Sequence, residues 1–557
     1  MGEYLKLKKS NCKDCYKCIR HCPVKSISFI NHQATIIEDE CILCGMCFVT
    51  CPQNAKEVRN DIYKAKALIN SGADVYVSLA PSFIANYEGY NFESLDDALK
   101  HLGFKGTFET AEGATGVKNA YDELVNKNDS DVIISTCCHS VNLLVQKHFP
   151  EATKYLAKVA SPMQAHAKRI KKDHPGCAVV FIGPCISKKA EAESYPGDVD
   201  CVLTFEELSY WLEEEKISLK KLPDVKAFGK TRLFPTSGGI LETMKKNNPD
   251  YHYLFVDGVE NCIRTIKNIL SGGIHKCFIE MSACVGSCIG GPAIVKKEHN
   301  LLKDYLLIDS YAGDTDFEFR TDDILLSKNI EKSNIHLAMP SDLDIREIFE
   351  KMGKFSKEKE LNCGSCGYNT CYDKAVAIYR GKADPSMCLP FIKEKAETFS
   401  DNIIGITPNG ILVLNDSFEI QLINKSACDI LNIKNSSDVI GMPVIRILDP
   451  SDFVNVSMTK EAITEKKVFL ADYKKTIEET ITYDEKYHII ICIMRDITSL
   501  ENAKSEKEVI SRNTIEITDK VIQKQMRVVQ EIASLLGETT AETKIALTKL
   551  KESLKDD

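Results

Sequence analysis

The segment EMSACVGSCIGG, from Glu280 to Gly291, is the stretch on which the interpretation of this chain depends. It carries Cys284 and Cys288 in a run of small residues, and its glycines let the backbone approach a bulky group closely. Two thiolates at this spacing can hold neighbouring iron atoms of one cluster. By itself the pattern fits a small buried cysteine pair equally well, so other segments must decide between the two.

Two upstream segments favour the cluster. Cys137 and Cys138 follow the apolar run VII, and Cys185 follows the apolar run AVVFIG. Short apolar runs of this kind are typical of buried strands. Three strand-then-loop segments that each deliver cysteine at the carboxyl end predict a cofactor site at the edge of an α/β sheet.

Together, the three segments resemble the signature motifs of FeFe (iron-only) hydrogenases, and the resemblance runs from about residue 75 to 315. It implies an H-cluster, in which a 4Fe-4S cube is joined through one cysteine sulfur to a diiron subcluster bearing CO, cyanide and a dithiolate bridge. The cube ligands that it implies are Cys138, Cys185, Cys284 and Cys288, the last of them shared with the diiron unit.

The resemblance also implies roles around the diiron unit. Cys137 matches the thiol that passes protons to the dithiolate amine, Lys188 matches the lysine that binds a cyanide, and Glu191 stands at the motif glutamate of the family. The segment SLAPSF matches the part of the pocket that meets the other cyanide. Within that segment the implied pocket residues are Ala80, Pro81 and Ser82. The further pocket residues implied are Phe234, Pro235 and the segment Ser161–Gln164.

Several positions depart from the catalytic members of that family. Gly183 and Ser282 stand where methionine is usual, and Ala157 stands at the serine of the usual proton path. Ser282 could donate a hydrogen bond where a thioether could not, so it joins the candidate catalytic residues. Glu123 is the one glutamate available for that path, and His139 is either an alternative proton carrier or a neutral change. The departures resemble the sensory branch of the family and argue against fast turnover.

Residues 1–60 contain the motif CxxCxxCxxxCP twice, which is the pattern of bacterial two-cluster ferredoxins. In such modules each fourth cysteine binds the other cluster. The expected ligands are Cys12, Cys15, Cys18 and Cys51 for one cube, and Cys41, Cys44, Cys47 and Cys22 for the other. A pair of zinc sites is the alternative. The residues between the motifs alternate like a short hairpin, and the module is expected to conduct electrons.

A fourth cysteine group lies within residues 316–395, which we interpret as a connector and a small domain. Its C-x2-C-x4-C-x16-C pattern resembles a small 4Fe-4S domain of some iron–sulfur and corrinoid proteins, and zinc is again the alternative. The expected ligands are Cys363, Cys366, Cys371 and Cys388.

Residues 396–499 alternate like antiparallel strands, with a turn at Asn415-Asp416, and resemble a PAS sensor domain whose ligand the sequence does not identify. Cys428 and Cys492 are expected in its core. His488 stands in an apolar run, which predicts a buried core histidine, with a haem ligand as the alternative.

Residues 500–557 contain no proline, and apolar residues recur at helical steps from Ile510 to Leu535. This predicts a paired helix that ends near Gly537, a second helix after it, and a homodimer; a solvated tail helix is the alternative. No histidine follows His488 and no kinase domain is recognisable. The output is therefore expected to pass by contact to a partner, for which the family suggests a phosphatase or a kinase.

Composition limits the remaining possibilities. The chain has 557 residues, is 44% hydrophobic and 27% charged, and carries a net charge of −9, which supports neither a nucleic-acid nor a membrane-surface role. It contains no apolar run that would span a bilayer, and its first residues lack the core of a secretion signal. Its 23 cysteines stand at metal-ligand spacings, which indicates reduced thiolates in the cytoplasm of an anaerobe or of a cell in low oxygen.

We therefore expect an α/β multidomain protein with a ferredoxin-like module (1–60), an α/β H-cluster domain (61–315), the small 4Fe-4S part (316–395), an α+β PAS domain (396–499) and signalling helices (500–557). Its expected function is a hydrogen or redox sensor that reacts reversibly with H2 and signals through the PAS domain. The alternative is a working hydrogenase that exchanges electrons with ferredoxin or another carrier. A scaffold without the diiron unit is disfavoured by Lys188 and by the segments SLAPSF and SPMQ.

Overall fold

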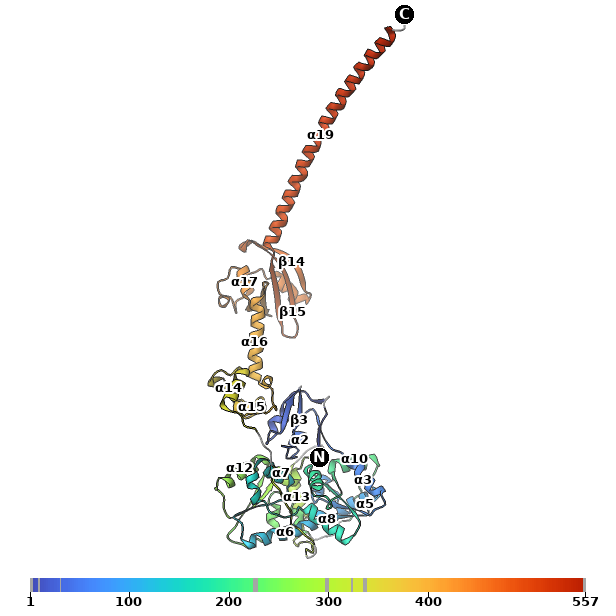
Figure 1. Ribbon diagram of the computed structural model, residues 1–557, viewed down its shortest axis with the longest axis vertical. Coiled ribbons are helices and arrows are strands. Elements are labelled where there is room, and N and C mark those ends of the chain that lie inside the picture. Colours follow the sequence, from blue (N-terminus) through green and yellow to red (C-terminus); the bar gives the residue numbers. More distant parts are fainter. Residues whose placement is uncertain are drawn as a thin grey trace. The chain divides into compact units, whose positions relative to one another are not determined.

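Figure 1 shows the computed structural model of the chain. The structure describes residues 4–8, 11–30, 32–223, 229–295, 300–321, 324–333 and 338–553. They form two compact units, Met1–Ile392 and Lys393–Asp557, and each is described here by itself.

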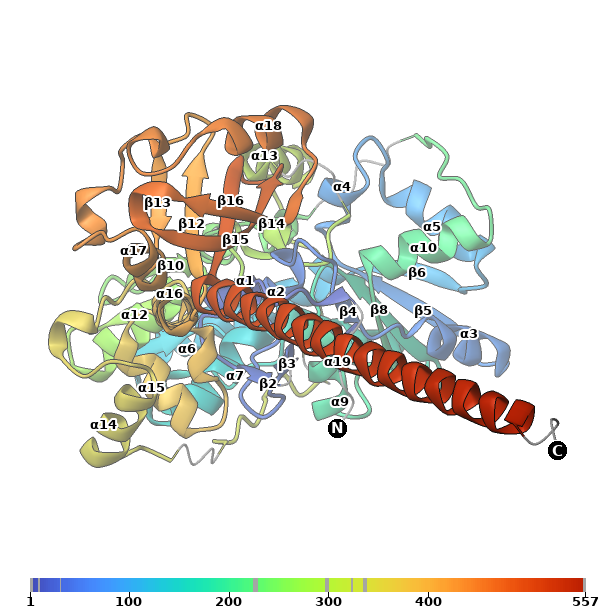
Figure 2. The ribbon, with the colours of Figure 1, turned by 90° about the horizontal axis from the view of Figure 1, so that it is seen from above.

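Two parallel sheets lie at the centre of the first unit. One has the strand order β6 (Gly106–Glu109), β5 (Val75–Leu79), β8 (Ala178–Gly183) and β9 (Cys201–Thr204). The other has the order β10 (His252–Asp257), β11 (Cys277–Ser282) and β7 (Val132–Ile134). Figure 2 shows β6, β5 and β8 side by side. Every residue of β5, β8, β11 and β7 is buried, as expected of parallel strands covered on both faces.

Helices cover these sheets and connect their strands. They are α3 (Ile62–Asn70), α4 (Phe83–Asn86), α5 (Phe92–His101), α6 (Thr110–Lys127), α7 (His139–His148), α8 (Pro162–Asp173), α9 (Ser187–Ser194), α10 (Phe205–Glu214), α11 (Gly239–Thr243), α12 (Val259–Leu270) and α13 (Leu301–Tyr311). The segment SPMQ is the start of α8: Ser161 is the N-cap, Pro162 follows it, and the Gln164 side chain accepts the Ser161 backbone N–H at 3.3 Å. A pocket motif of the sequence is thus also a helix-start signal.

The ferredoxin module and the small domain belong to the same unit. The residues between the two ferredoxin motifs form the predicted hairpin, with β2 (Ile27–Ile30) antiparallel to β3 (Gln33–Ile36). The other elements are β1 (Leu5–Leu7), α1 (Lys17–His21), α2 (Met46–Val49), β4 (Lys56–Val58), α14 (Asp342–Lys351) and α15 (Cys371–Tyr379). α16 (Leu389–Ile406) begins directly after Cys388.

The second unit contains a five-stranded antiparallel sheet. Its order is β13 (Ile420–Ile423), β12 (Gly410–Asn415), β16 (Ile489–Asp496), β15 (Lys475–Asp484) and β14 (Ile463–Leu470). The helices α17 (Lys425–Ile430) and α18 (Ser451–Thr459) accompany it. The predicted antiparallel strands are therefore confirmed, and Cys428 and Cys492 are buried as predicted.

The prediction of a buried His488 was wrong. His488 lies in the turn between β15 and β16, with a φ of 54°, and its side chain is 69% exposed. Its Nδ1 lies 3.2 Å from the hydroxyl of Tyr483. The apolar run begins one residue later, at Ile489, because the turn has to reverse the chain before β16 starts.

The prediction that Gly537 ends a helix was also wrong. α19 runs without a break from Thr498 to Ser553, and Figure 1 shows it as one long rod. A glycine inside a helix costs about 1 kcal/mol relative to alanine, which does not stop a helix that has good helix-forming residues on both sides. Within the described residues, no helix combines the length and the apolar character that crossing a membrane requires.

Candidate active site and metal centres

Loops at the carboxyl ends of three parallel strands bring four cysteines to one place. Cys138 follows β7, Cys185 follows β8, and the other two follow β11, as the strand-then-loop pattern predicts. The sulfur-lined cavity, here called the cube cavity, is bordered by Cys138, Cys185, Cys284 and Cys288. Burial raises the pKa of three of these thiols, so the protein interior alone does not stabilise their thiolates. Four thiols around open space fit a 4Fe-4S cube.

A second cavity, here called the diiron cavity, adjoins the cube cavity. Cys137, Cys185, Lys188 and Cys288 border both cavities. The second cavity is also lined by Ala80, Pro81, Ser82, Met163, Phe234 and Pro235. The hydroxyl of Ser82 is buried and has no hydrogen-bond partner among the described residues. The cavity therefore offers an ammonium group, a free hydroxyl and a cysteine shared with the cube site, which fits a diiron unit with polar ligands.

Cys137 lies in this cavity beside a residue that sequence reasoning missed. The Tyr121 hydroxyl, on α6, is 3.2 Å from the Cys137 sulfur and accepts the Thr136 N–H at 2.9 Å. Tyr121 is fully buried. Burial raises the pKa of Cys137 to about 12, so the thiol carries its proton at neutral pH. In the sequence, Tyr121 is a lone aromatic residue in GATGVKNAYDEL, and such a residue is equally well explained as part of the core.

Lys188 and Glu191 lie one turn apart on α9 and form a buried ion pair. The Lys188 ammonium also donates to the Cys137 carbonyl at 3.0 Å. The other oxygen of Glu191 pairs with Lys328 at 2.5 Å. Burial would raise the pKa of Glu191, but the two ammonium groups outweigh it and hold the pKa well below its usual range. Lys328 lies in the connector, and sequence reasoning missed it.

The structure gives a reason for one departure, Gly183, and places another, Ser282, away from the diiron cavity. A Cβ at Gly183 would lie 2.8 Å from the ring of Phe181, which lines the diiron cavity two residues earlier on β8. Phe181 thus occupies space beside Gly183, and the departure does not simply remove bulk. Ser282 borders the cube cavity and is not among the residues that line the diiron cavity.

The expected proton path finds little support. Ala157 is buried and has no side-chain proton to pass, and Glu123 is exposed on α6. Burial lowers the pKa of His139 to about 3, and neither ring nitrogen has a hydrogen-bond partner among the described residues. A neutral, unpartnered imidazole is a poor relay, so the structure disfavours His139 as the alternative carrier.

Glu280 is a further residue that sequence reasoning missed, although it lies in the deciding segment. Its buried carboxylate accepts the backbone N–H groups of Gly238, Ile240 and Leu241 at 3.0–3.2 Å. These hydrogen bonds act to lower the pKa of Glu280, but burial outweighs them and raises it to about 8. Glu280 thereby fixes the loop that follows Phe234-Pro235, two of the cavity residues.

The ferredoxin cysteines separate into the two predicted sets. One cavity is lined by Cys12, Cys15, Cys18 and Cys51. Cys51, the fourth cysteine of the second motif, therefore lies with the first three cysteines of the first motif. Cys22 lies close enough to Cys41, Cys44 and Cys47 to affect their pKa values. No three potential ligand side chains among the described residues converge on a single-ion site, whereas these sets surround space for a cluster.

The second ferredoxin set lies against the cube cavity. Cys44 borders the cube cavity together with Cys138 and Cys284. A Cβ at Gly45 would lie 2.4 Å from Pro292, which directly follows the deciding segment. This close approach needs glycine, whose φ is +75° here. The two cluster sites are therefore neighbours across a tightly packed junction.

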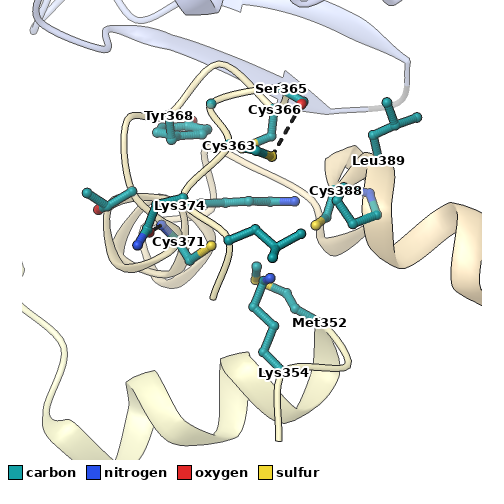
Figure 3. A pocket seen from close by; sticks show the side chains of 15 residues that line it. Met352, Lys354, Cys363, Ser365, Cys366, Tyr368, Cys371, Lys374, Cys388 and Leu389 are labelled. Carbon is teal, nitrogen blue, oxygen red and sulfur yellow. Dashed lines mark hydrogen bonds between the residues drawn. The ribbon is translucent and has the colours of Figure 1, made fainter. Parts of the chain in front are cut away.

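The small domain forms a fourth sulfur-lined cavity. Figure 3 shows Cys363, Cys366, Cys371 and Cys388 around it, with Lys354 and Lys374 extending toward the same space. The Ser365 hydroxyl lies 3.3 Å from the Cys363 sulfur. This hydrogen bond lowers the pKa of the exposed Cys363 thiol, whereas burial raises the pKa of Cys138, Cys284 and Cys288 at the cube site.

The small domain packs on the ferredoxin module. Cys22 and Cys366 belong to one buried apolar cluster that also contains Tyr368. The Lys25 ammonium donates to the Gly367 carbonyl at 2.8 Å, and a Cβ at Gly367 would lie 3.0 Å from Ile19. The second ferredoxin set therefore neighbours both the H-cluster site and the small-domain site.

Comparisons with known proteins agree with this geometry. Residues 73–292 match the family model of the iron only hydrogenase large subunit, C-terminal domain. Residues 360–390 match a putative Fe-S cluster model, and residues 34–57 match the 4Fe-4S binding domain.

Curated relatives are distant. Iron hydrogenase 1 of Clostridium pasteurianum is 24% identical over 372 residues, which cover 52% of this chain and 64% of that protein. Cytosolic iron-sulfur assembly component 3 of Rattus norvegicus is 23% identical over 345 residues, covering 47% of this chain and 72% of that protein. The cytosolic Fe-S cluster assembly factor NAR1 of Kluyveromyces lactis is 34% identical over 98 residues, covering 17% of this chain and 21% of that protein. The chain thus spans less than two thirds of the first of these relatives.

Solved structures give weak overall likenesses. An apo FeFe-hydrogenase from Chlamydomonas reinhardtii covers 45% of this chain and 88% of its own, with 17% identity and a TM-score of 0.38. The PAS domain of nitrogen regulation protein NR(II) from Vibrio parahaemolyticus covers 18% of this chain and 97% of its own, with 15% identity and a TM-score of 0.16. The assignment therefore rests on the family models and on the sequence relatives. By these, the chain is a hydrogenase-like iron–sulfur protein.

Proposed function

We propose that this protein reacts reversibly with H2 at an H-cluster and serves as a hydrogen sensor. The observation that carries the proposal is the second cavity, bordered by Cys137, Lys188 and Cys288, because a 4Fe-4S cube needs only the first. A bound diiron unit would supply the reaction 2H+ + 2e− = H2. Among the chain's own residues, Lys188 and Ser82 are the polar groups that would hold its cyanides, and Cys288 is the ligand shared with the cube.

The residues around the cavity support slow chemistry. Cys137 holds a proton on its sulfur inside the cavity, but its neighbour there is Tyr121, where the usual path would need a carboxylate. Ala157 adds no hydroxyl. The apolar side chains of Met163, Phe181 and Phe234 border the cavity and would exclude water from the reacting atoms.

The cluster sites support a route for electrons from the H-cluster to the small domain. The set that contains Cys44 is next to the H-cluster site, and Cys22 of the same set shares an apolar cluster with Cys366. The other ferredoxin set includes the exposed Cys15, at which ferredoxin or another carrier could exchange electrons. The second ferredoxin cube would thus distribute electrons among three neighbours.

The end of this route supports the sensor over the working hydrogenase. Cys388, the last ligand of the small domain, directly precedes α16, and the chain from α16 leads to the five-stranded sheet that we propose is a PAS domain. A change of charge at this cluster acts on the first turn of α16. The output would then pass by contact to a phosphatase or kinase.

The deciding experiment uses matured protein and measures infrared bands, H2 turnover and cluster reduction together. The sensor predicts CO and cyanide bands, slow turnover, and reduction of the small-domain cluster when H2 is added. Fast turnover would favour the working hydrogenase. Absence of the bands would favour an iron–sulfur assembly role, which the names of two relatives carry.

We also propose a homodimer through α19. Its apolar side chains, among them Ile510, Ile517, Val521 and Ile532, are half or more exposed in the single chain. A helical seam of this kind is stabilised by pairing with an identical helix. Truncation at about residue 500 should give a monomer with unchanged hydrogen chemistry, measured by light scattering and turnover. A truncated protein that stays dimeric would exclude α19 as the main interface.

A further inference from the structure

Glu191 lies between two lysines that come from distant parts of the sequence. Lys188 precedes it by one turn of α9, and Lys328 lies in the connector, outside the region that matches the hydrogenase family model. The carboxylate is completely buried, and the Lys328 side chain is only 2% exposed. Each lysine pairs with a different carboxylate oxygen, so Glu191 can exchange one partner and keep the other.

Lys328 is held firmly in this position. Its backbone N–H donates to the Lys158 carbonyl at 3.0 Å, which ties the connector to the segment before α8. Its ammonium lies 4.5 Å from the centre of the Tyr195 ring. The Tyr195 hydroxyl in turn donates to the Asn329 carbonyl at 2.8 Å. Backbone and ring contacts together direct the Lys328 side chain toward Glu191.

The charges of the three groups do not balance. One carboxylate and two ammonium groups sum to one positive charge in a buried site. An excess charge in a buried site is unfavourable without an anion beside it, so these groups suit an anion in the adjoining space, where Cys185 is also close enough to interact with Lys188. The diiron cavity, which Lys188 borders, is the adjoining space in which such an anion would lie.

We infer that Lys328 is a positioning residue, which keeps Glu191 paired while Lys188 turns its ammonium toward an anionic ligand in the diiron cavity. Without Lys328 that turn would leave a lone buried carboxylate, and Lys188 would remain with Glu191 instead. The inference rests on the proposed function, because the anionic ligand in question is a cyanide of the diiron unit.

The test uses full-length protein that carries its 4Fe-4S clusters but no diiron unit. It is titrated with a synthetic diiron dithiolate complex bearing CO and cyanide, and uptake is followed by infrared spectroscopy. Lys328→Met should require roughly tenfold more complex for half-loading, the size expected for one charge-assisted hydrogen bond. Its cyanide band should also differ from that of the parent protein, because Lys188 donates less to the ligand.

Matched variants separate positioning from folding. Lys332→Met, an exposed lysine of the same segment, should behave as the parent, and Lys328→Arg should largely restore loading. In a Glu191→Gln background, Lys328→Met should have a much smaller effect, because the carboxylate that it serves is gone. If Lys328→Met does not fold, Lys328→Gln removes the charge and keeps a polar contact, and the same loss is expected.

Three results would overturn the inference, and failure of the proposed function can be told apart from failure of the positioning role. If the parent loads and Lys328→Met loads equally well with the same cyanide band, Lys328 has no positioning role. The same conclusion follows if Lys328→Met weakens loading equally in the parent protein and in the Glu191→Gln background. If the parent and Lys332→Met take up no complex either, the proposed function fails and this inference fails with it.

Discussion

The candidate H-cluster site and the small-domain site each have four cysteines but are built in opposite ways. The first collects Cys138, Cys185 and the pair in the deciding segment from loops after three parallel strands, whereas the second lies between Cys363 and Cys388 around α15. Burial raises thiol pKa values at the first site, and a local hydrogen bond lowers that of Cys363 at the second. The first site therefore depends on the whole α/β domain, and the second on a short segment.

The largest expected difference between the two sites appears when one cysteine of each is replaced by alanine. Matured protein should contain about eighteen iron atoms, from four cubes and one diiron unit. Cys138→Ala should lose the cube and the diiron unit, about six atoms, together with all CO and cyanide bands. Cys363→Ala should lose at most about four atoms and keep those bands. Iron analysis and infrared spectra check this; a parent near eight iron atoms, or one with substantial zinc, would contradict it.

Replacement of Cys137 tests the role of this thiol in H2 turnover separately from assembly of the cluster. Cys137 adjoins a ligand but is not needed as one, so Cys137→Ala should keep the infrared bands while H2 turnover falls by roughly 10²–10⁴-fold, the usual worth of a positioned proton donor. Cys177→Ala, at a half-buried thiol outside the site, is the control. Full activity would mean that protons take another route. A lost cluster would mean that Cys137 and Cys138 have exchanged roles.

The sequence predicted those parts of both sites that local patterns encode. Spacing grouped the cysteines that the fold brings together, including Cys51 with the first ferredoxin set and Cys22 with the second, because cluster ligands recur at fixed separations. Apolar runs placed the strands that carry Cys138 and Cys185. The small domain, with its ligands in one segment, could be interpreted almost completely in this way.

What the sequence could not show comes from contacts between distant segments. Lys328 reaches Glu191 from the connector, and Tyr121 reaches Cys137 from α6; neither pair has a sequence spacing that predicts a contact. Both missed contacts lie at the candidate H-cluster site, because that site is assembled by tertiary structure.

Tyr121 tests whether that tertiary contact matters. Tyr121→Phe removes the hydroxyl that lies 3.2 Å from the Cys137 sulfur and leaves the buried ring in place. Losing one hydrogen bond at the proton-carrying thiol should slow H2 turnover about tenfold, with unchanged iron content. Tyr253→Phe, at a half-buried tyrosine outside both cavities, is the control, and equal rates in the two variants would exclude a role for the Tyr121 hydroxyl.

The smallest expected effect concerns the charges at the small-domain site. Lys374 is 1% exposed, lines the cavity, and donates to the Pro385 carbonyl at 3.1 Å, so its ammonium is fixed near the four cysteines. A nearby positive charge stabilises the reduced, more negative cluster. Lys374→Met should therefore lower the reduction potential of this cluster, by roughly 50–100 mV for a charge a few ångströms away in a partly buried site.

Redox titration followed by electron paramagnetic resonance measures this shift, and the H-cluster serves as an internal reference because its site does not include Lys374. Lys351→Met, at an exposed lysine of α14, should leave both potentials unchanged. An equal shift at the H-cluster would mean that the two sites are not electrostatically separate. No shift at either would mean that the potential of the small-domain cluster is determined by other features, such as its exposure at Cys363.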